Sequence, residues 1–233
     1  TFNERRIPMT ILTGATSYQL ADAFIRLNNG SPLKDYDMFW AWKDKPLLKA
    51  VERLVLNNER LSVALGNLDV KYRPDLANWV ALVYGLATHN SGNITTSYLR
   101  ISNDEVNNGL DIAVDDVFVS DGINAFIQVL ETAWSRAGVA VLDKEKTVFK
   151  KVGKIAAFFL HEWMTNDNKP AVIAKWVDVL VRYRTEPDMK SALTVTGAQN
   201  LNDKKITAVL DRLNTYLVTG RLPGGGSVDS DDE

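Results

Sequence analysis

The chain has 233 residues, of which 45% are hydrophobic and 24% are charged. These proportions are ordinary for a globular protein with a large core. Cysteine is absent and only two histidines occur, which excludes disulfides and thiolate metal sites and leaves a zinc site dependent on carboxylates. No apolar run approaches the roughly 20 residues that span a bilayer, and no secretory signal is evident. We therefore expect a cytoplasmic protein without a membrane partner.

The formal net charge of −2 conceals a segregated charge pattern. The segment 101–135 holds seven acidic residues and no lysine or arginine, whereas 136–154 holds six basic residues and two acidic ones. The last five residues add four more acids. Blocks of opposite charge can steer a charged partner or pair head-to-tail between copies of the chain.

The first two segments predict an arm followed by a helix. Residues 1–12 show no helical period, which is typical of an extended N-terminal arm or an edge strand. The TGAT run at 13–16 could begin a nucleotide-binding turn, but further glycines would be needed where Ser17 and Leu20 stand. A capped helix that stops at Gly30 is the simpler interpretation.

The next elements are predicted from aromatic, proline and capping signals. Large aromatic and methionine side chains crowd 36–42, which predicts a plug of the core or, if they are exposed, a partner site. Pro46 is predicted to open a helix through about 46–57, and Pro74 to open another. Asp121 is predicted to cap a helix over 123–137.

The segment 110–119 is ambiguous between a strand and a helix. Its carboxylates Asp111, Asp115 and Asp116 are candidate Mg²⁺ ligands. Without a second acidic cluster at a recognisable spacing, a solvated acidic surface is the alternative that we favour.

The longest helical pattern spans 143–164, with Asp143 as its predicted N-cap. Its apolar residues share one face, and the opposite side carries Lys146, Lys150, Lys154 and His161, flanked by Lys151 and Phe158. Such a basic stripe is usually a solvated face, and we expect His161 at the surface. Lysines one turn apart also match successive phosphates of a nucleic acid. Phe158 is predicted to pack in the core or, alternatively, to stack on a base.

Three further helices and a tail complete the chain. A helix beginning at 168–170 is predicted to pack antiparallel to the 143–164 helix. A short helix is expected over 187–193 and a last one over 201–218. The glycine-rich, acidic segment 221–233 predicts a flexible tail.

The predicted class is all-α. We expect a helical body of eight to ten helices over 13–220, either as one domain or as two lobes, 13–100 and 101–220. No nucleophile elbow, Walker loop, HExxH motif or pair of cysteines occurs, and His161 and Glu162 diverge by about 100° on a helix. We therefore expect neither an enzyme nor a cofactor nor a metal.

An arm, a helical body with a basic stripe and an acidic tail are the parts of a subunit that polymerises on nucleic acid. In this layout the chain resembles viral nucleocapsid and filament coat proteins, although no motif allows functional residues of those proteins to be assigned to positions in this sequence. We expect a self-assembling coat subunit that holds the backbone of single-stranded RNA without sequence specificity and binds copies of itself through arm and tail. Its location would be the host cytoplasm and the virion. The predicted RNA-binding residues are Lys71, Arg73, Lys146, Lys150, Lys151, Lys154, Arg182 and Arg184.

The alternative is a helical protein–protein interaction or adaptor module that binds no nucleic acid. The aromatic run at 36–42 and the segregated charge would then serve a protein partner. The sequence pI of 5.8 favours this alternative, because nucleic-acid-binding domains are usually basic. Salt dependence distinguishes the two, since phosphate binding weakens steeply with salt.

Overall fold

The structure is a computed structural model. It describes residues 43–65, 73–93, 111–138, 149–195 and 201–223, together with 13–16, 19 and 23. For 73–77, 93 and 149–151 it describes the backbone alone. In this part of the chain there are eight α-helices, one π-helical turn and one 3-10 turn, and no strand. The predicted all-α class is confirmed.

The first described helices follow the proline signals. Pro46 stands at the start of α3 (Pro46–Val51), which widens into a π-helical turn (Glu52–Leu56). Asn58 then starts α4 (Glu59–Ala64), because its side chain accepts a hydrogen bond from the Leu61 amide at 3.0 Å. Helix α5 (Arg73–Ala87) begins one residue before Pro74. The crowded segment 36–42 lies outside the described residues.

Helix α7 (Asp116–Ala137) corrects the predicted start at 123. Its N-cap is Asp115, whose carboxylate accepts hydrogen bonds from the amides of Val117 and Phe118 at 3.1 and 3.2 Å. Asp121 lies exposed within the helix. Both aspartates are good capping residues, but burial of Val119 adds a turn of core-facing helix before Asp121.

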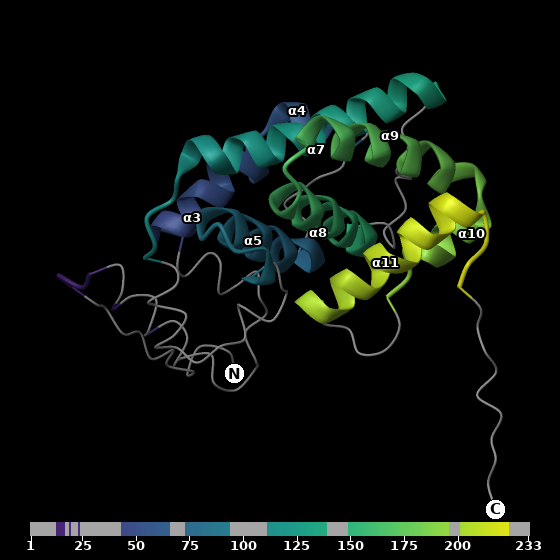
Figure 1. The fold of residues 1–233 in the computed structure, drawn as a ribbon. Helices are drawn as coiled ribbons and strands as arrows, with labels where there is room; N and C mark the ends of the chain where they lie inside the picture. Colours follow the sequence, from purple (N-terminus) through teal and green to yellow (C-terminus); the bar gives the residue numbers. More distant parts are fainter. Residues whose placement is uncertain are drawn as a thin grey trace, which may run out of the picture.

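Helices α8 (Phe149–Thr165) and α9 (Lys169–Thr185) are joined by three residues that reverse the chain (Figure 1). Asn168 caps α9 by accepting a hydrogen bond from the Ala171 amide at 3.2 Å, as the pattern at 168–170 predicts. The predicted cap of the preceding helix, Asp143, lies outside the described residues. Two helices follow, α10 (Pro187–Ala192) and α11 (Asp203–Thr219).

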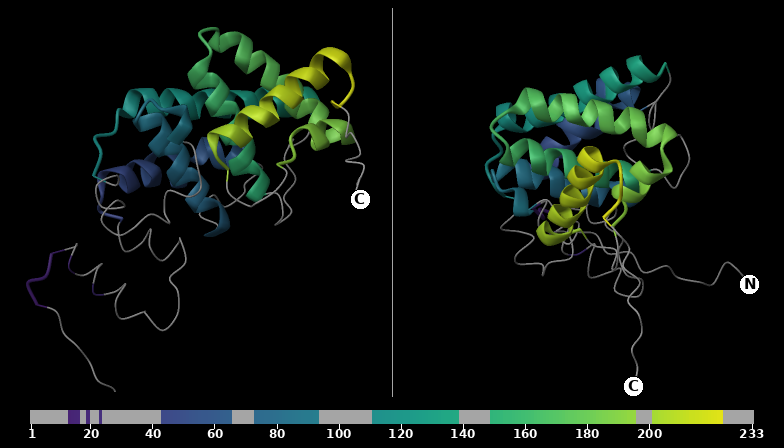
Figure 2. Two further views of the ribbon diagram at one scale, coloured as in Figure 1. Left: turned by 60° about the horizontal axis from the view of Figure 1, so that its bottom comes forward. Right: turned by 45° about the vertical axis from the view of Figure 1, so that its right-hand side comes forward.

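Helix α8 lies at the centre of the described helices. The most extensive packing pairs α7 with α9 and α5 with α8. Figure 1 and Figure 2 show α7 and α9 on one side of α8 and α11 on the other. Ring contacts link the inner helices, with centroids 6.4 Å apart for Trp79 and Phe126, 5.6 Å for Phe126 and Phe159, and 6.2 Å for Phe159 and Trp176. These four rings come from α5, α7, α8 and α9 and are fully buried, so they join the four helices in one core.

The central position of α8 shortens its predicted basic face. Residues 156–160 are all buried, so this part of the helix is covered on every side. Phe158 is 0% exposed and belongs to the core. His161, predicted at the surface, is 9% exposed, because α11 packs against α8. The predicted lysine row therefore does not continue along α8 beyond Lys154, which is half-buried. No helix within the described ranges has both the length and the apolarity to cross a bilayer.

Candidate functional site

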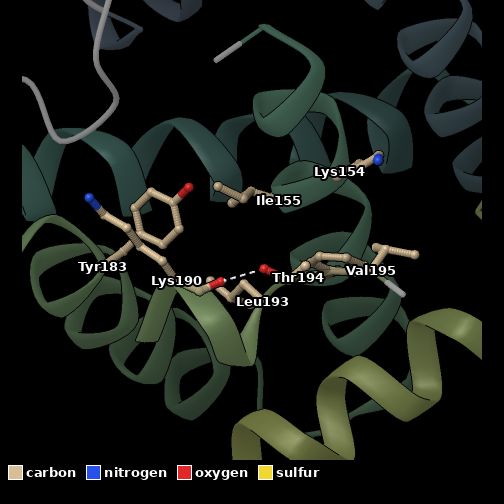
Figure 3. A pocket seen from close by; sticks show the side chains of 8 residues that line it. Lys154, Ile155, Tyr183, Lys190, Leu193, Thr194 and Val195 are labelled. Carbon is tan, nitrogen blue, oxygen red and sulfur yellow. Dashed lines mark hydrogen bonds between the residues drawn. The ribbon is translucent and has the colours of Figure 1, made fainter. Parts of the chain in front are cut away.

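A cavity of about 180 Å³ opens where α8, α9 and α10 meet (Figure 3). Three elements and the segment after α10 supply its lining, which consists of Lys154, Ile155, Phe158, Tyr183, Lys190, Leu193, Thr194 and Val195. Its floor is apolar, since Ile155, Phe158 and Leu193 are 2%, 0% and 7% exposed. The described lining residues include no acidic side chain.

The rim of the cavity is cationic. Lys190 is exposed and Lys154 is half-buried, and neither forms an ion pair with the residues that the structure describes. The Lys190 Nζ atom lies 5.9 Å from the ring centroid of Tyr183, within the range of a cation–π contact. In Figure 3 the two ammonium groups lie at opposite ends of the cavity, with Tyr183 and Ile155 between them. An anion at the rim would therefore meet positive charge from two sides.

Helix α11 holds this rim in place through Arg212. The Arg212 Nε atom donates a hydrogen bond to the Ala192 carbonyl at 2.8 Å, and its guanidinium also donates to the Thr194 carbonyl. Burial lowers the pKa of Arg212 from its ordinary value, although an arginine remains charged at neutral pH. The Thr194 hydroxyl donates to the Lys190 carbonyl at 2.9 Å. These bonds fix the turn that brings Lys190 to the cavity.

Arg182, a predicted RNA-binding residue, lies in a network that fastens α9 to α11. Its Nε atom donates to both Glu186 carboxylate oxygens, at 3.0 and 3.1 Å, and its Nη1 atom lies 3.6 Å from Asp178 Oδ2. The guanidinium also lies over the Tyr216 ring, 5.3 Å from its centroid. Its hydrogen bond to Glu186 raises the pKa of Arg182. Much of its charge is therefore compensated within the chain.

The structure describes the other predicted RNA-binding residues to different extents. Arg184 is exposed, one residue after Tyr183 on α9. Lys150 and Lys151 stand one turn before Lys154 on α8 and Arg73 begins α5, but their side chains are not described. Lys71 and Lys146 lie outside the described residues. Of the predicted residues whose side chains are described, which are Lys154, Arg182 and Arg184, Lys154 lines the cavity.

Three cavity residues were missed by the sequence reasoning: Tyr183, Lys190 and Thr194. Lys190 stands on a helix of six residues, which is too short to show a charged stripe. Its approach to α8 depends on the Arg212 bonds, which join residues 18 and 20 positions apart. The sequence feature that could have indicated the cavity is the RYR run at 182–184, in which an aromatic residue stands between two basic residues at the end of a helix.

The acidic segment pairs with bases of the same chain. Asp111 lies 2.5 Å from the Lys45 ammonium, Asp116 2.5 Å from the Arg53 guanidinium, and Glu131 2.6 Å from that of Arg60. These ion pairs tie α3, the π-helical turn and α4 to the segment that leads into and forms α7. In the described part of the chain, no three His, Asp or Glu side chains converge as a metal site would require.

The adjacent pair His161 and Glu162 serves two different contacts. Glu162 accepts hydrogen bonds from Lys175 Nζ at 2.7 Å and from Trp176 Nε1 at 2.8 Å, which join α8 to α9. His161 Nδ1 lies 3.5 Å from Asp203 Oδ1 at the start of α11 and has no hydrogen-bond partner among the described residues. The two side chains therefore do not act on a common centre.

The chemistry of the cavity is that of binding. Its hydroxyls come from Tyr183 and Thr194, and the described lining residues include no histidine or carboxylate to act as a base toward them. An apolar floor under a rim with two lysines suits a ligand with a flat apolar part and negative charge. The chain matches no protein-family model, no curated protein and no solved structure.

Proposed function

We propose that the chain is a self-assembling coat subunit, of the nucleocapsid or filament type, that holds the phosphate backbone of single-stranded RNA without sequence specificity. The cavity between α8, α9 and α10 carries the proposal, because Lys154 and Lys190 present charge at its two ends and neither forms an ion pair within the described part of the chain. Lysine contacts to phosphates release counterions and provide sequence-independent affinity. In the proposal, Lys146, Lys150 and Lys151 extend the contact along the chain that leads into α8, with Arg184 nearby on α9.

The acidic composition of the chain does not oppose a local basic site. The net charge is −2, but carboxylates of the acidic segment are compensated by Lys45, Arg53 and Arg60. Among the described residues, no acidic side chain lines the cavity. Because the potential over a cleft depends on the charges nearest to it, the cavity attracts a polyanion even though the whole chain is slightly acidic.

The remaining parts of the proposal concern assembly and location. Copies bind one another through the arm, 1–12, and the tail, 221–233, while the helical body holds RNA. Such head-to-tail contacts produce open filaments or closed rings. The subunit acts in the host cytoplasm and in the virion, and it performs no catalysis.

The proposal is tested by removing the two rim charges together. We expect Lys154→Gln with Lys190→Gln to weaken binding of a short, labelled, mixed-sequence single-stranded RNA, measured by fluorescence anisotropy over a series of salt concentrations. The slope of log affinity against log salt should fall by about 0.7 for each lost phosphate contact, or about 1.4 for two. Circular dichroism should be unchanged, because neither ammonium is buried or ion-paired within the described chain.

The matched control is Lys43→Gln with Lys49→Gln. Both of these lysines are exposed at α3, and their replacement makes the same change in net charge. The control variant should retain most of the affinity and most of the salt slope. Equal affinities and slopes for the cavity variant and the wild type would remove the cavity from the RNA-binding surface. A wild-type chain without salt-dependent RNA binding would favour the adaptor module.

A further inference from the structure

We propose that the cavity between α8, α9 and α10 is a slot for one unstacked base of single-stranded RNA. The phosphates on either side of that base lie at Lys154 and Lys190. This inference rests on the proposed function and deepens it, since it states which part of the RNA enters the cavity. It adds a base contact to a surface that would otherwise hold the backbone alone.

The size of the cavity fits a single ring. Its volume is about 180 Å³, whereas a cavity of about 150 Å³ lined by aliphatic and aromatic side chains is enough to bind benzene. One water needs roughly 10–15 Å³ by a comparable measure, so the space is far larger than a hydration site. A six-membered ring therefore fits this space.

The lining offers a base both apolar contact and an aromatic neighbour. Ile155 and Phe158 stand one turn apart on α8 and form the floor with Leu193. Tyr183 supplies a partly buried ring at the side. Stacking of bases on aromatic side chains is the usual source of affinity for single strands, and it tolerates sequence because every base has a flat face. Thr194 stands exposed at the rim.

The two lysines distinguish a nucleotide from an uncharged aromatic ligand. Their ammonium groups lie at opposite ends of the cavity in Figure 3, where a nucleic-acid chain entering and leaving the slot carries its phosphates. An aromatic side chain from a second copy would fill the apolar floor but would leave both ammonium groups without an opposite charge. Charge complementarity therefore favours the nucleotide over a protein side chain.

The test separates base binding from phosphate binding. We compare the affinity of the full chain for oligouridylate with that for an oligomer of the same length whose riboses carry no bases. The abasic oligomer keeps every phosphate, so it reports the backbone contact alone. We expect the wild type to bind oligouridylate roughly tenfold more tightly, which is within the range for one stacked base.

A filled cavity should remove this difference without weakening the backbone contact. We expect Val195→Phe to bind oligouridylate and the abasic oligomer about equally, at the wild-type affinity for the abasic oligomer, because Val195 lines the cavity. Val218→Phe is the control, because Val218 is 87% exposed on α11 and is not among the described lining residues. The control variant should retain the preference for oligouridylate.

Several outcomes would overturn the inference. Equal binding of the two oligomers by the wild type would leave the proposed backbone contact standing and exclude a base slot. Displacement of RNA by a peptide of residues 1–12 from the wild type but not from Val195→Phe would assign the cavity to protein binding. Failure of both oligomers to bind would instead overturn the proposed function itself.

Discussion

The carboxylate of Glu186 connects three helices at a single residue. It accepts two hydrogen bonds from Arg182 and one from the Tyr216 phenol at 2.9 Å, at the point where α9 ends and α10 begins. The hydrogen bond from Arg182 lowers the pKa of Glu186 from its ordinary value, with the Tyr216 bond acting in the same direction. The same carboxylate raises the pKa of Tyr216. The ionised form of Glu186 is therefore the form that the folded chain favours.

We expect Glu186→Gln to lower the free energy of unfolding at neutral pH by about 1 kcal/mol. The value is small because the Glu186 side chain is 37% exposed, so solvent screens its ion pair with Arg182. Since the pKa of Glu186 is lower in the folded state, its stabilisation is present above the unfolded pKa and is lost as pH falls through the folded value. The difference between variant and wild type should therefore shrink from about pH 6 to about pH 3. Urea denaturation at several pH values measures it.

Asp211→Asn is the control for this pH dependence. Asp211 is an exposed carboxylate on α11 without a partner among the described residues, and its replacement should leave the free energy of unfolding nearly constant. A wild-type minus Glu186→Gln difference that stays constant or grows on acidification would contradict the assigned pairing.

At single residues, the sequence predicts which side of a helix faces the core, but not which residues of other helices it contacts. The helical period places Lys154 on a solvent-facing side and the apolar residues of α8 inside, and both are found. It cannot show that α11 covers His161, because Asp203 is 42 positions away and no local signal links the two. The contact between Arg182 and the Tyr216 ring cannot be predicted for a similar reason, since Tyr216 comes from a different helix. Residue roles that depend on contacts between helices need the fold.

At the scale of elements, helix boundaries follow local chemistry where that chemistry is unambiguous. Pro46 and Asn168 each stand at a predicted helix start. The start of α7 was predicted wrongly because Asp115 and Asp121 are equally good caps, and the choice between them is made by burial of Val119. The π-helical turn after α3 has no signal of its own in the sequence.

The crossing of α7 with α5 and α8 depends on Gly122. A Cβ atom there would stand 2.9 Å from Leu86 Cδ2 and 3.4 Å from Trp163 Cζ3. Leu86 is 0% and Trp163 is 6% exposed, so neither has free space into which to move. The absence of a side chain at Gly122 allows the three helices to approach one another closely.

We expect Gly122→Val to lower the free energy of unfolding by about 2 kcal/mol, because its methyl groups overpack a filled contact. Adding Leu86→Ala should cost less in the Gly122→Val background than in the wild type, since the shorter side chain makes room. Chemical denaturation of the four proteins gives this coupling. Ala174→Val, at an exposed position of α9, controls for placing a branched residue in a helix. Additive effects of the two core substitutions would contradict the proposed close contact.

At the scale of the whole molecule, acidic residues of the segment 101–135 form ion pairs within the described chain, whereas the two lysines at the cavity do not. Asp111, Asp116 and Glu131 meet bases from α3, the π-helical turn and α4, so they are less available to a neighbouring copy than the sequence suggests. Lys154 and Lys190 have no such partners within the described chain. The acidic block therefore supports the fold, and contacts between copies are left to other segments, of which we propose the arm and the tail.

We propose that assembly depends on the arm, and deleting residues 1–10 tests this proposal. Since the described core is built from residues within 43–223, we expect the truncated chain to keep its helical circular dichroism spectrum. Sedimentation velocity with RNA present should show smaller particles, approaching the 26.0 kDa of one chain. Affinity for a short RNA that spans one subunit should be unchanged, while cooperativity on long RNA should fall.

The control is a chain whose arm has the same composition in scrambled order. It shows whether assembly depends on the sequence of the arm or on its charge alone. An unaltered sedimentation profile after deletion would place the contacts between copies on the helical body.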